Sequence, residues 1–72
     1  MKKFRVESNF SKGRTITGYS THMQALAAYT EQVEAETGWS YPETAFVEVS
    51  VCGRGRRDIR EYVVVDGFFE RA

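Results

Sequence analysis

The sequence of 72 residues predicts a single small α+β domain over residues 1–72, with one helix packed on one face of a mainly antiparallel four-stranded sheet in the order ββαββ. Two observations lead to this class. Only residues 22–37 combine a helical period with capping signals at both ends. On either side of that segment, apolar and polar residues alternate with period two and glycine-containing turns separate the stretches, as expected for hairpins.

The first two strands precede the helix. Phe4 and Val6 alternate with charged residues, which is typical of a half-buried strand. The pair Lys12-Gly13 then offers a tight turn into residues 14–19, which are rich in the β-favouring types Thr, Ile and Tyr. We therefore expect a hairpin at the N-terminus.

The helix is expected from about His22 to Thr37. Thr21 and Gln24 have the spacing of a capping box, in which each side chain bonds the other residue's free backbone N–H, and Gly38 supplies the left-handed residue that ends a helix. At 100° per residue, one broad stripe is expected to face the core. That stripe consists of Met23, Leu26, Tyr29, Thr30, Val33 and Thr37. The opposite side collects Gln24, Ala25, Ala28, Gln32 and Ala35, a smooth surface that is either an ordinary exposed helix face or a surface for close packing by a partner.

The second hairpin follows a loop at Tyr41-Pro42. Alternating valines predict a strand around residues 47–51, residues 53–58 form a glycine-punctuated turn, and residues 59–65 are rich in β-branched types. Gly67 is expected to end that strand before a short Phe68-Phe69 tail.

The far face of this sheet has no helix to cover it, because a single helix of about four turns covers only one side. Strand neighbours point to opposite faces, so the large apolar residues of the second hairpin cannot all face the helix. We expect Phe46, Tyr62 and Val64 on the uncovered face, where an apolar patch indicates an interface, and we expect a homodimer through it.

Charge is strongly segregated along the chain although the formal net charge is zero. Residues 15–53 form a run of 39 without any Lys or Arg, and that run includes five glutamates. The segments 1–14 and 54–60 have net charges of +4 and +3. Such a chain can present one basic and one acidic surface, and charged surfaces select partners.

Several classes of function are disfavoured. Cys52 is the single cysteine, which excludes an internal disulfide and favours a reduced, cytoplasmic protein. No apolar stretch approaches the ~20 residues of a membrane helix, and no apolar region follows the basic start as in a signal peptide. With His22 as the other ligand type, the chain lacks the four ligands of a structural zinc site, and nothing in the spacing pairs His22 with Cys52 for nucleophilic catalysis. We expect neither an enzyme nor a metal or cofactor.

The arginine-rich segment is the first candidate for binding. Four arginines in seven residues can form bidentate hydrogen bonds to phosphates or carboxylates. They are Arg54, Arg56, Arg57 and Arg60. Two features argue against a nucleic-acid-binding function: the isoelectric point is only about 6.6, and the sequence lacks an aromatic RNA-recognition motif.

A second candidate surface lies on and after the helix. Glu31 and Glu36 lie at the edges of its outer face, and Trp39 and Tyr41 flank the following loop. An aromatic pair in such a loop is either a lid on the core or a binding anchor.

These observations predict a small non-enzymatic binding protein that occupies a surface of a larger protein or nucleoprotein complex. By analogy of size and composition alone, a phage or mobile-element inhibitor of a host defence complex, as anti-CRISPR proteins are, fits this description. The alternative is a small nucleic-acid-binding regulator that uses the arginine hairpin Arg54–Arg60.

Overall fold

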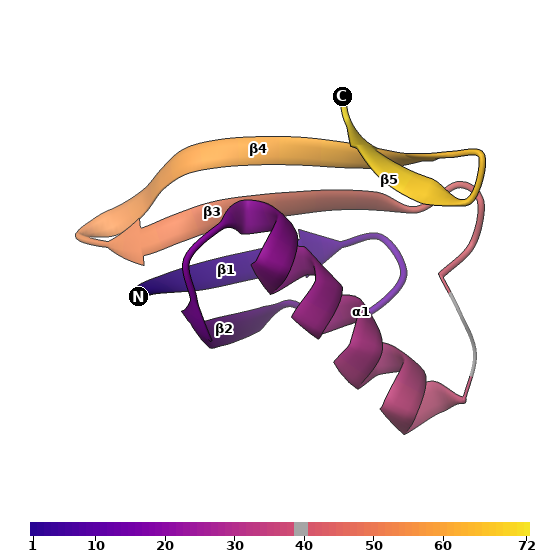
Figure 1. Cartoon of the computed structure of the whole chain (residues 1–72), viewed down its shortest axis with the longest axis horizontal. Coiled ribbons are helices and arrows are strands. Elements are labelled where there is room, and N and C mark those ends of the chain that lie inside the picture. Colours follow the sequence, from indigo (N-terminus) through magenta and orange to yellow (C-terminus); the bar gives the residue numbers. More distant parts are fainter. Residues whose placement is uncertain (39–40) are drawn as a thin grey trace.

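The computed structural model describes residues 1–38 and 41–72, which form one helix and one antiparallel sheet of five strands (Figure 1). The elements are β1 (Lys2–Ser8), β2 (Arg14–Tyr19), α1 (His22–Thr37), β3 (Phe46–Gly53), β4 (Gly55–Val65) and β5 (Phe68–Arg71). In the sheet the strands lie in the order β2-β1-β3-β4-β5. The α+β class with one helix on an antiparallel sheet is confirmed, whereas the expected four strands and ββαββ order were wrong by one strand.

The additional strand is β5, which forms a hairpin with β4. Asp66 and Gly67 both have positive φ, 51° and 83°, and connect Val65 to its cross-strand partner Phe68. Two positive φ angles in a two-residue loop are the geometry of a type I′ turn, which favours Asp-Gly. Residues 68–71 therefore pair with β4 instead of forming a free tail.

The β3–β4 hairpin is tighter than the sequence predicts. β3 ends at Gly53 and β4 begins at Gly55, whose φ of 87° suits a glycine, so the expected turn over residues 53–58 mostly belongs to a strand. β4 also contains a bulge at Asp58, which has a positive φ of 47°. Because successive strand residues point to opposite faces, most of the arginines lie along the strand and not together on a turn.

Helix α1 has the limits and caps that the sequence predicts. The Gln24 amide nitrogen donates to Thr21 Oγ1 over 3.2 Å, and the Thr21 amide donates to Gln24 Oε1 over 3.2 Å, which completes the capping box. At the other end Gly38 is left-handed and its N–H donates to the carbonyl oxygen of Glu34 over 2.8 Å.

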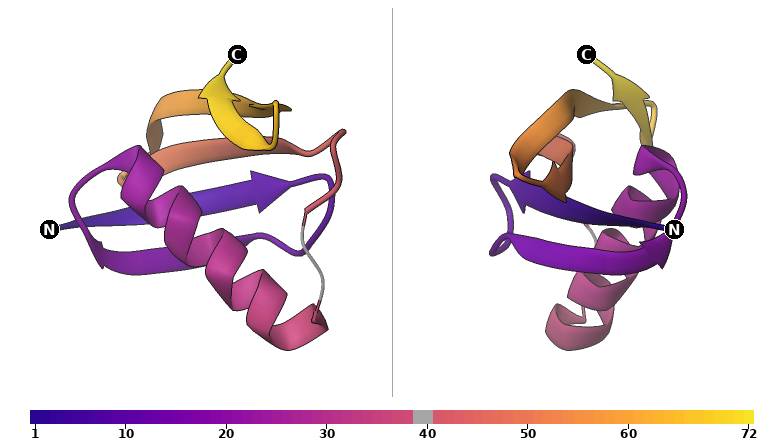
Figure 2. Two further views of the ribbon diagram at one scale, coloured as in Figure 1. Left: turned by 45° about the vertical axis from the view of Figure 1, so that its right-hand side comes forward. Right: turned by 90° about the vertical axis from the view of Figure 1, so that its left-hand side faces the viewer.

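The core lies between α1 and the sheet face formed mainly by β1, β2 and β3, which the helix crosses (Figures 1 and 2). Its members are Phe4, Val6, Ile16, Ala25, Leu26, Ala28, Tyr29, Val33, Val47, Val49, Val51 and Tyr62. The expected helix stripe is partly wrong: Ala25 and Ala28 are buried, whereas Met23 and Thr37 are exposed. Small side chains toward the sheet let the helix backbone approach it closely, so two residues of the expected outer face belong to the core.

The face of the sheet away from α1, here called the open face, has no helix over it among residues 1–38 and 41–72 (Figure 2). Phe46 pairs with Val63, whereas the core residue Val47 pairs with Tyr62. Tyr62 is therefore on the helix side and only 3% exposed, and Val64, two residues further, points to the same side. Of the three residues expected on the open face, only Phe46 lies there. Homodimerisation stays a prediction.

Candidate functional site

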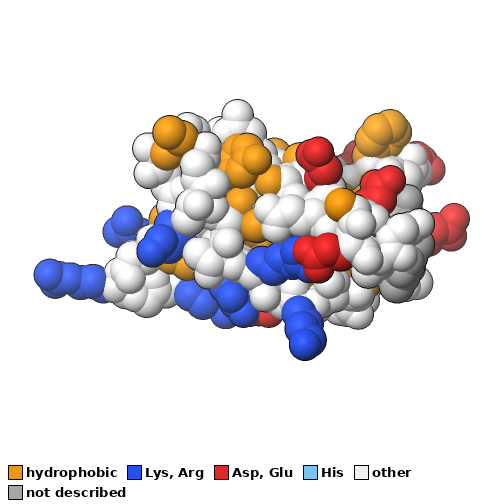
Figure 3. Space-filling view, turned by 90° about the horizontal axis from the view of Figure 1, so that it is seen from below, with side chains coloured by type: hydrophobic (Ala, Val, Ile, Leu, Met, Phe, Trp, Pro, Cys, Tyr) orange, Lys and Arg blue, Asp and Glu red, His pale blue; other side chains and the backbone are white. Residues whose placement is uncertain are grey.

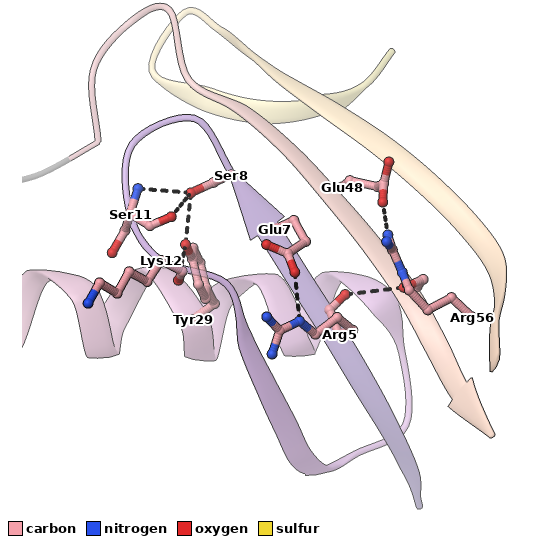
Figure 4. A network of polar contacts seen from close by, with 9 residues as sticks. Arg5, Glu7, Ser8, Ser11, Lys12, Tyr29, Glu48 and Arg56 are labelled. Atoms are coloured by element: carbon pink, nitrogen blue, oxygen red, sulfur yellow. Dashed lines mark hydrogen bonds and ion pairs between the residues drawn. The ribbon is translucent and has the colours of Figure 1, made fainter. Parts of the chain in front are cut away.

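Two of the four arginines in the candidate segment are held by acidic residues of the same chain. Arg56 forms an ion pair with Glu48, and its Nε also donates to Ser50 Oγ over 3.0 Å (Figure 4). Arg60 binds Asp58 through two contacts of 3.3 Å, from Nε to Oδ1 and from Nη2 to Oδ2. These two guanidinium groups are therefore partly neutralised before any partner arrives.

Arg54 and Arg57 differ from this pair. Both are exposed, and within residues 1–38 and 41–72 neither forms an ion pair. Arg54 occupies the tip of the hairpin between β3 and β4, and Arg57 is the cross-strand partner of Val51. The structure thus divides the expected cluster into two engaged and two available arginines.

Two lysines from the other end of the chain join the available arginines. Phe4 pairs with Val51, so the start of β1 lies beside the end of β3 and the hairpin tip (Figure 1). Lys2 and Lys3 are exposed there, and the charge of Lys2 contributes to the lowered pKa of Asp58. We call this group the basic end. It consists of Lys2, Lys3, Arg54 and Arg57, and Lys and Arg side chains gather at this end of the molecule in Figure 3.

Lys2 and Lys3 were not among the site residues expected from the sequence. These lysines lie about fifty residues before the arginines in the sequence. The antiparallel pairing of β1 with β3 brings the two segments together, and that pairing has no local sequence signature. One sequence feature is consistent with their joining the arginines: basic residues flank the acidic segment on both sides.

The strand segment with the arginines is anchored from beneath by His22. His22 is 3% exposed, its Nε2 donates to the carbonyl oxygen of Asp58 over 2.7 Å, and its ring packs edge-on against Phe4 at 5.1 Å. Hydrogen bonding from Arg60 is the main cause that lowers the pKa of Asp58. Cys52 follows the core residue Val51 and so points to the open face, away from His22.

The acidic helix surface is less available than the sequence predicts. Glu36 forms a two-point ion pair with Arg14 of β2, in which Arg14 Nη2 donates to Glu36 Oε1 over 2.7 Å. Hydrogen bonding by Arg14 lowers the pKa of Glu36, and Glu36 in turn raises that of Arg14. Glu31 stays exposed and borders a shallow hollow of about 270 Å³ with Tyr19. Acidic side chains gather in Figure 3 at the end opposite the basic one.

The two aromatic candidates have different outcomes. Trp39 lies outside the described residues. The Tyr41 hydroxyl donates to the carbonyl oxygen of Gly67 over 2.7 Å, and its ring lies 4.5 Å from that of Phe69 and 6.3 Å from that of Phe10. Tyr41 therefore connects the β4–β5 hairpin to Phe10 of the N-terminal hairpin, and its role in partner binding stays a prediction.

Metal sites and membrane-spanning segments were also considered for the part of the chain that the structure describes. Residues 1–38 and 41–72 contain no group of three or more His, Cys, Asp or Glu that could hold a metal ion. The described helix is neither long nor apolar enough to cross a membrane. No family model, curated protein or solved structure matched the chain.

Proposed function

We propose that this chain is a small non-enzymatic binding protein that occupies an acidic surface of a larger protein or nucleoprotein complex through its basic end. One observation supports this most. Four exposed cations from two distant segments converge at one end, while Glu48 and Asp58 of the neighbouring strands are bound by Arg56 and Arg60.

The chemistry of the basic end suits carboxylates or phosphates. Arginine presents planar donors that bind either group in two-point contacts, and lysine adds a mobile point charge. Ile59, 50% exposed within the arginine segment, adds an apolar contact of the kind found beside charged anchors in protein interfaces. Inhibition of a host defence complex is the specific form of this proposal that size and composition support by analogy.

The experiment compares charge reversal at two places. The variant Arg54→Glu/Arg57→Glu changes the basic end, and Lys12→Glu/Arg71→Glu applies the same net change elsewhere on the surface. Each form is used for affinity capture from lysate of the source organism, with and without nuclease, followed by mass spectrometry. A partner retained by the parent and the control but lost by the basic-end variant supports the proposal, and equal retention by all three forms contradicts it.

The alternative is a nucleic-acid-binding regulator, and the same cations favour it. Lys2, Lys3, Arg54 and Arg57 provide about four phosphate contacts, for which the logarithm of affinity falls with the logarithm of salt at a slope of about −3 to −4. Fluorescence anisotropy with a labelled duplex and a single strand at two salt concentrations measures that slope. No binding at low salt contradicts this alternative and leaves the protein surface as the target.

A further inference from the structure

Strand β5 is one edge of the sheet and pairs only with β4 (Figure 1). In an antiparallel pair, successive residues turn their backbone N–H and C=O groups alternately toward the partner strand and away from it. The Ala72 N–H donates to the carbonyl oxygen of Glu61 over 2.9 Å, so position 72 turns toward β4. Glu70 therefore turns toward β4 as well, whereas Phe69 and Arg71 present their backbone groups to the free edge.

These outward backbone groups have no hydrogen-bond partner in the described part of the chain. Phe69 and Arg71 each offer one donor and one acceptor, which is the template that an added strand needs. The opposite edge of the sheet is less open, because Arg14 of β2 forms its ion pair with Glu36 of α1 and the pairing of β2 with β1 shifts in register near Tyr19. A regular ladder can therefore continue at β5.

A hollow lies between this edge and the helix, which packs mainly on β1, β2 and β3. Its volume is about 210 Å³. Small-molecule pockets measure about 300–1,000 Å³, so this hollow suits one side chain of a protein better than a cofactor. Apart from one threonine its lining is apolar or aromatic: Met23, Leu26, Ala27 and Thr30 of α1, Tyr41, and Phe68 and Phe69 of β5.

The free edge and the hollow suit the same ligand. Phe69 pairs with Val64, which points to the helix side as Tyr62 does, and the Phe69 ring packs against the core. A strand added antiparallel to β5 would place one residue directly opposite Phe69, with its side chain on the same side of the sheet. That side chain would point to the hollow, while its backbone N–H and C=O bond those of Phe69. Main-chain bonds to a sheet edge together with a side-chain pocket are a recurring mode of peptide recognition.

A second copy of the chain suits this edge less well. Outward residues pair with outward residues, so a two-fold axis that pairs these groups within β5 passes by Phe69, Glu70 or Arg71. An axis at Glu70 or Arg71 sets identical charges directly opposite each other, which is destabilising. An axis at Phe69 sets the two Phe69 rings opposite each other, but each is already packed against its own core and cannot fill the other hollow.

We propose that the free edge of β5 binds an extended segment of a partner protein by β-strand addition, with one large apolar side chain of that segment in the hollow beside α1. This contact does not rest on the proposed function, because the basic end lies at the start of β4 and β5 pairs with the end of that strand. The chain would then recognise an unpaired β-segment at one place and an acidic surface at another.

The probe is a peptide selected from a phage-displayed library of random sequences of about 12 residues, longer than a typical strand. Selection on the parent protein is expected to enrich peptides with a large apolar residue in a β-favouring segment. The best peptide is synthesised with a fluorescent label, and anisotropy measures its affinity. N-methylation of the anchoring residue should abolish binding because its N–H faces β5, whereas N-methylation of the next residue, whose N–H faces away, should not.

Two pairs of variants separate the edge from the hollow. Arg71→Pro removes an outward N–H and no bond to β4, so it should bind about fivefold or more weakly than Arg71→Ala, which keeps that N–H. Ala27→Phe fills the hollow from an exposed helix position and should weaken binding by about tenfold or more. Ala35→Phe, at an exposed position elsewhere on α1, should not. Circular dichroism confirms that the variants fold.

Four outcomes would overturn the proposal. The first three are no enrichment of peptides, equal affinity of Arg71→Pro and Arg71→Ala, and equal affinity of Ala27→Phe and the parent. The fourth is a dimer in sedimentation velocity that Arg71→Pro dissociates and Arg71→Ala does not, which would assign the edge to a second copy. The Arg54→Glu/Arg57→Glu variant should bind the selected peptide as the parent does, so the failure of one proposal leaves the other standing.

Discussion

His22 Nε2 lies 2.7 Å from the carbonyl oxygen of Asp58 and donates a hydrogen bond to it. This contact joins the first turn of helix α1 to the bulge in β4, and it therefore links the core to the strand that holds the arginines. The carbonyl oxygen can only accept, so Nε2 has the proton. The nearest Asp58 carboxylate oxygen is 3.6 Å from the same nitrogen.

Loss of this bond should destabilise the protein and loosen the hairpin. His22→Leu leaves a carbonyl group without its partner, which costs about 1–3 kcal/mol. Urea denaturation measures the loss, and hydrogen exchange should show faster exchange around residues 56–60. Met23→Leu, a change at an exposed neighbouring position, is the control and should change neither measurement. Equal exchange in His22→Leu and the parent would contradict the anchoring role.

The Glu36–Arg14 pair predicts a dependence of stability on pH. The pKa of Glu36 is lower in the folded than in the unfolded chain, so the stabilisation is present above the unfolded pKa and is lost as the pH falls through the folded pKa. Melting temperatures measured from neutral to acidic pH should fall less steeply for Glu36→Gln than for the parent. The effect is small because the pair is exposed. Glu34→Gln is the control, and identical slopes for Glu36→Gln and the parent would contradict this prediction.

The β4–β5 turn should tolerate substitution poorly at its glycine. Gly67 has a φ of 83°, and a Cβ atom in the left-handed region costs about 1–2 kcal/mol. Gly67→Ala should therefore lower the melting temperature. Gly53→Ala is the matched control, since Gly53 is not among the positive-φ glycines and a Cβ there would meet the Arg57 guanidinium at an ordinary distance of 3.5 Å. Equal melting temperatures for the two variants would show that the Asp66-Gly67 turn is not required.

Helix orientation gives a test with two alanines of the same helix. Ala25 is fully buried against the sheet, whereas Ala35 is exposed. Ala25→Leu forces extra volume into a packed core and should cost about 1–3 kcal/mol, whereas Ala35→Leu should be nearly neutral. Chemical denaturation measures both. If both changes were nearly neutral, the helix would face the sheet with the side that the sequence stripe predicts, because that stripe leaves Ala25 and Ala35 exposed.

The limits of most secondary-structure elements follow from local sequence signals. The limits of α1 follow from Thr21, Gln24 and Gly38, because capping depends on hydrogen bonds between residues a few positions apart. The strands β1 and β3 follow from alternation, and β2 and the later part of β4 follow from β-favouring residue types, which are equally local signals. The start of β4 at Gly55 lies inside the turn that the sequence predicts. The strand β5 also has a local signal, because Asp66-Gly67 favours a two-residue hairpin turn.

The residues that meet on each surface depend on pairings between strands far apart in the sequence. The pairing of β1 with β3 brings Lys2 and Lys3 to the arginines, and the register of β3 on β4 places Phe46 with Val63 and buries Tyr62. A shift of one residue in that register would exchange the two faces. Such pairings depend on the combined packing of helix and sheet around one core, which no single segment encodes.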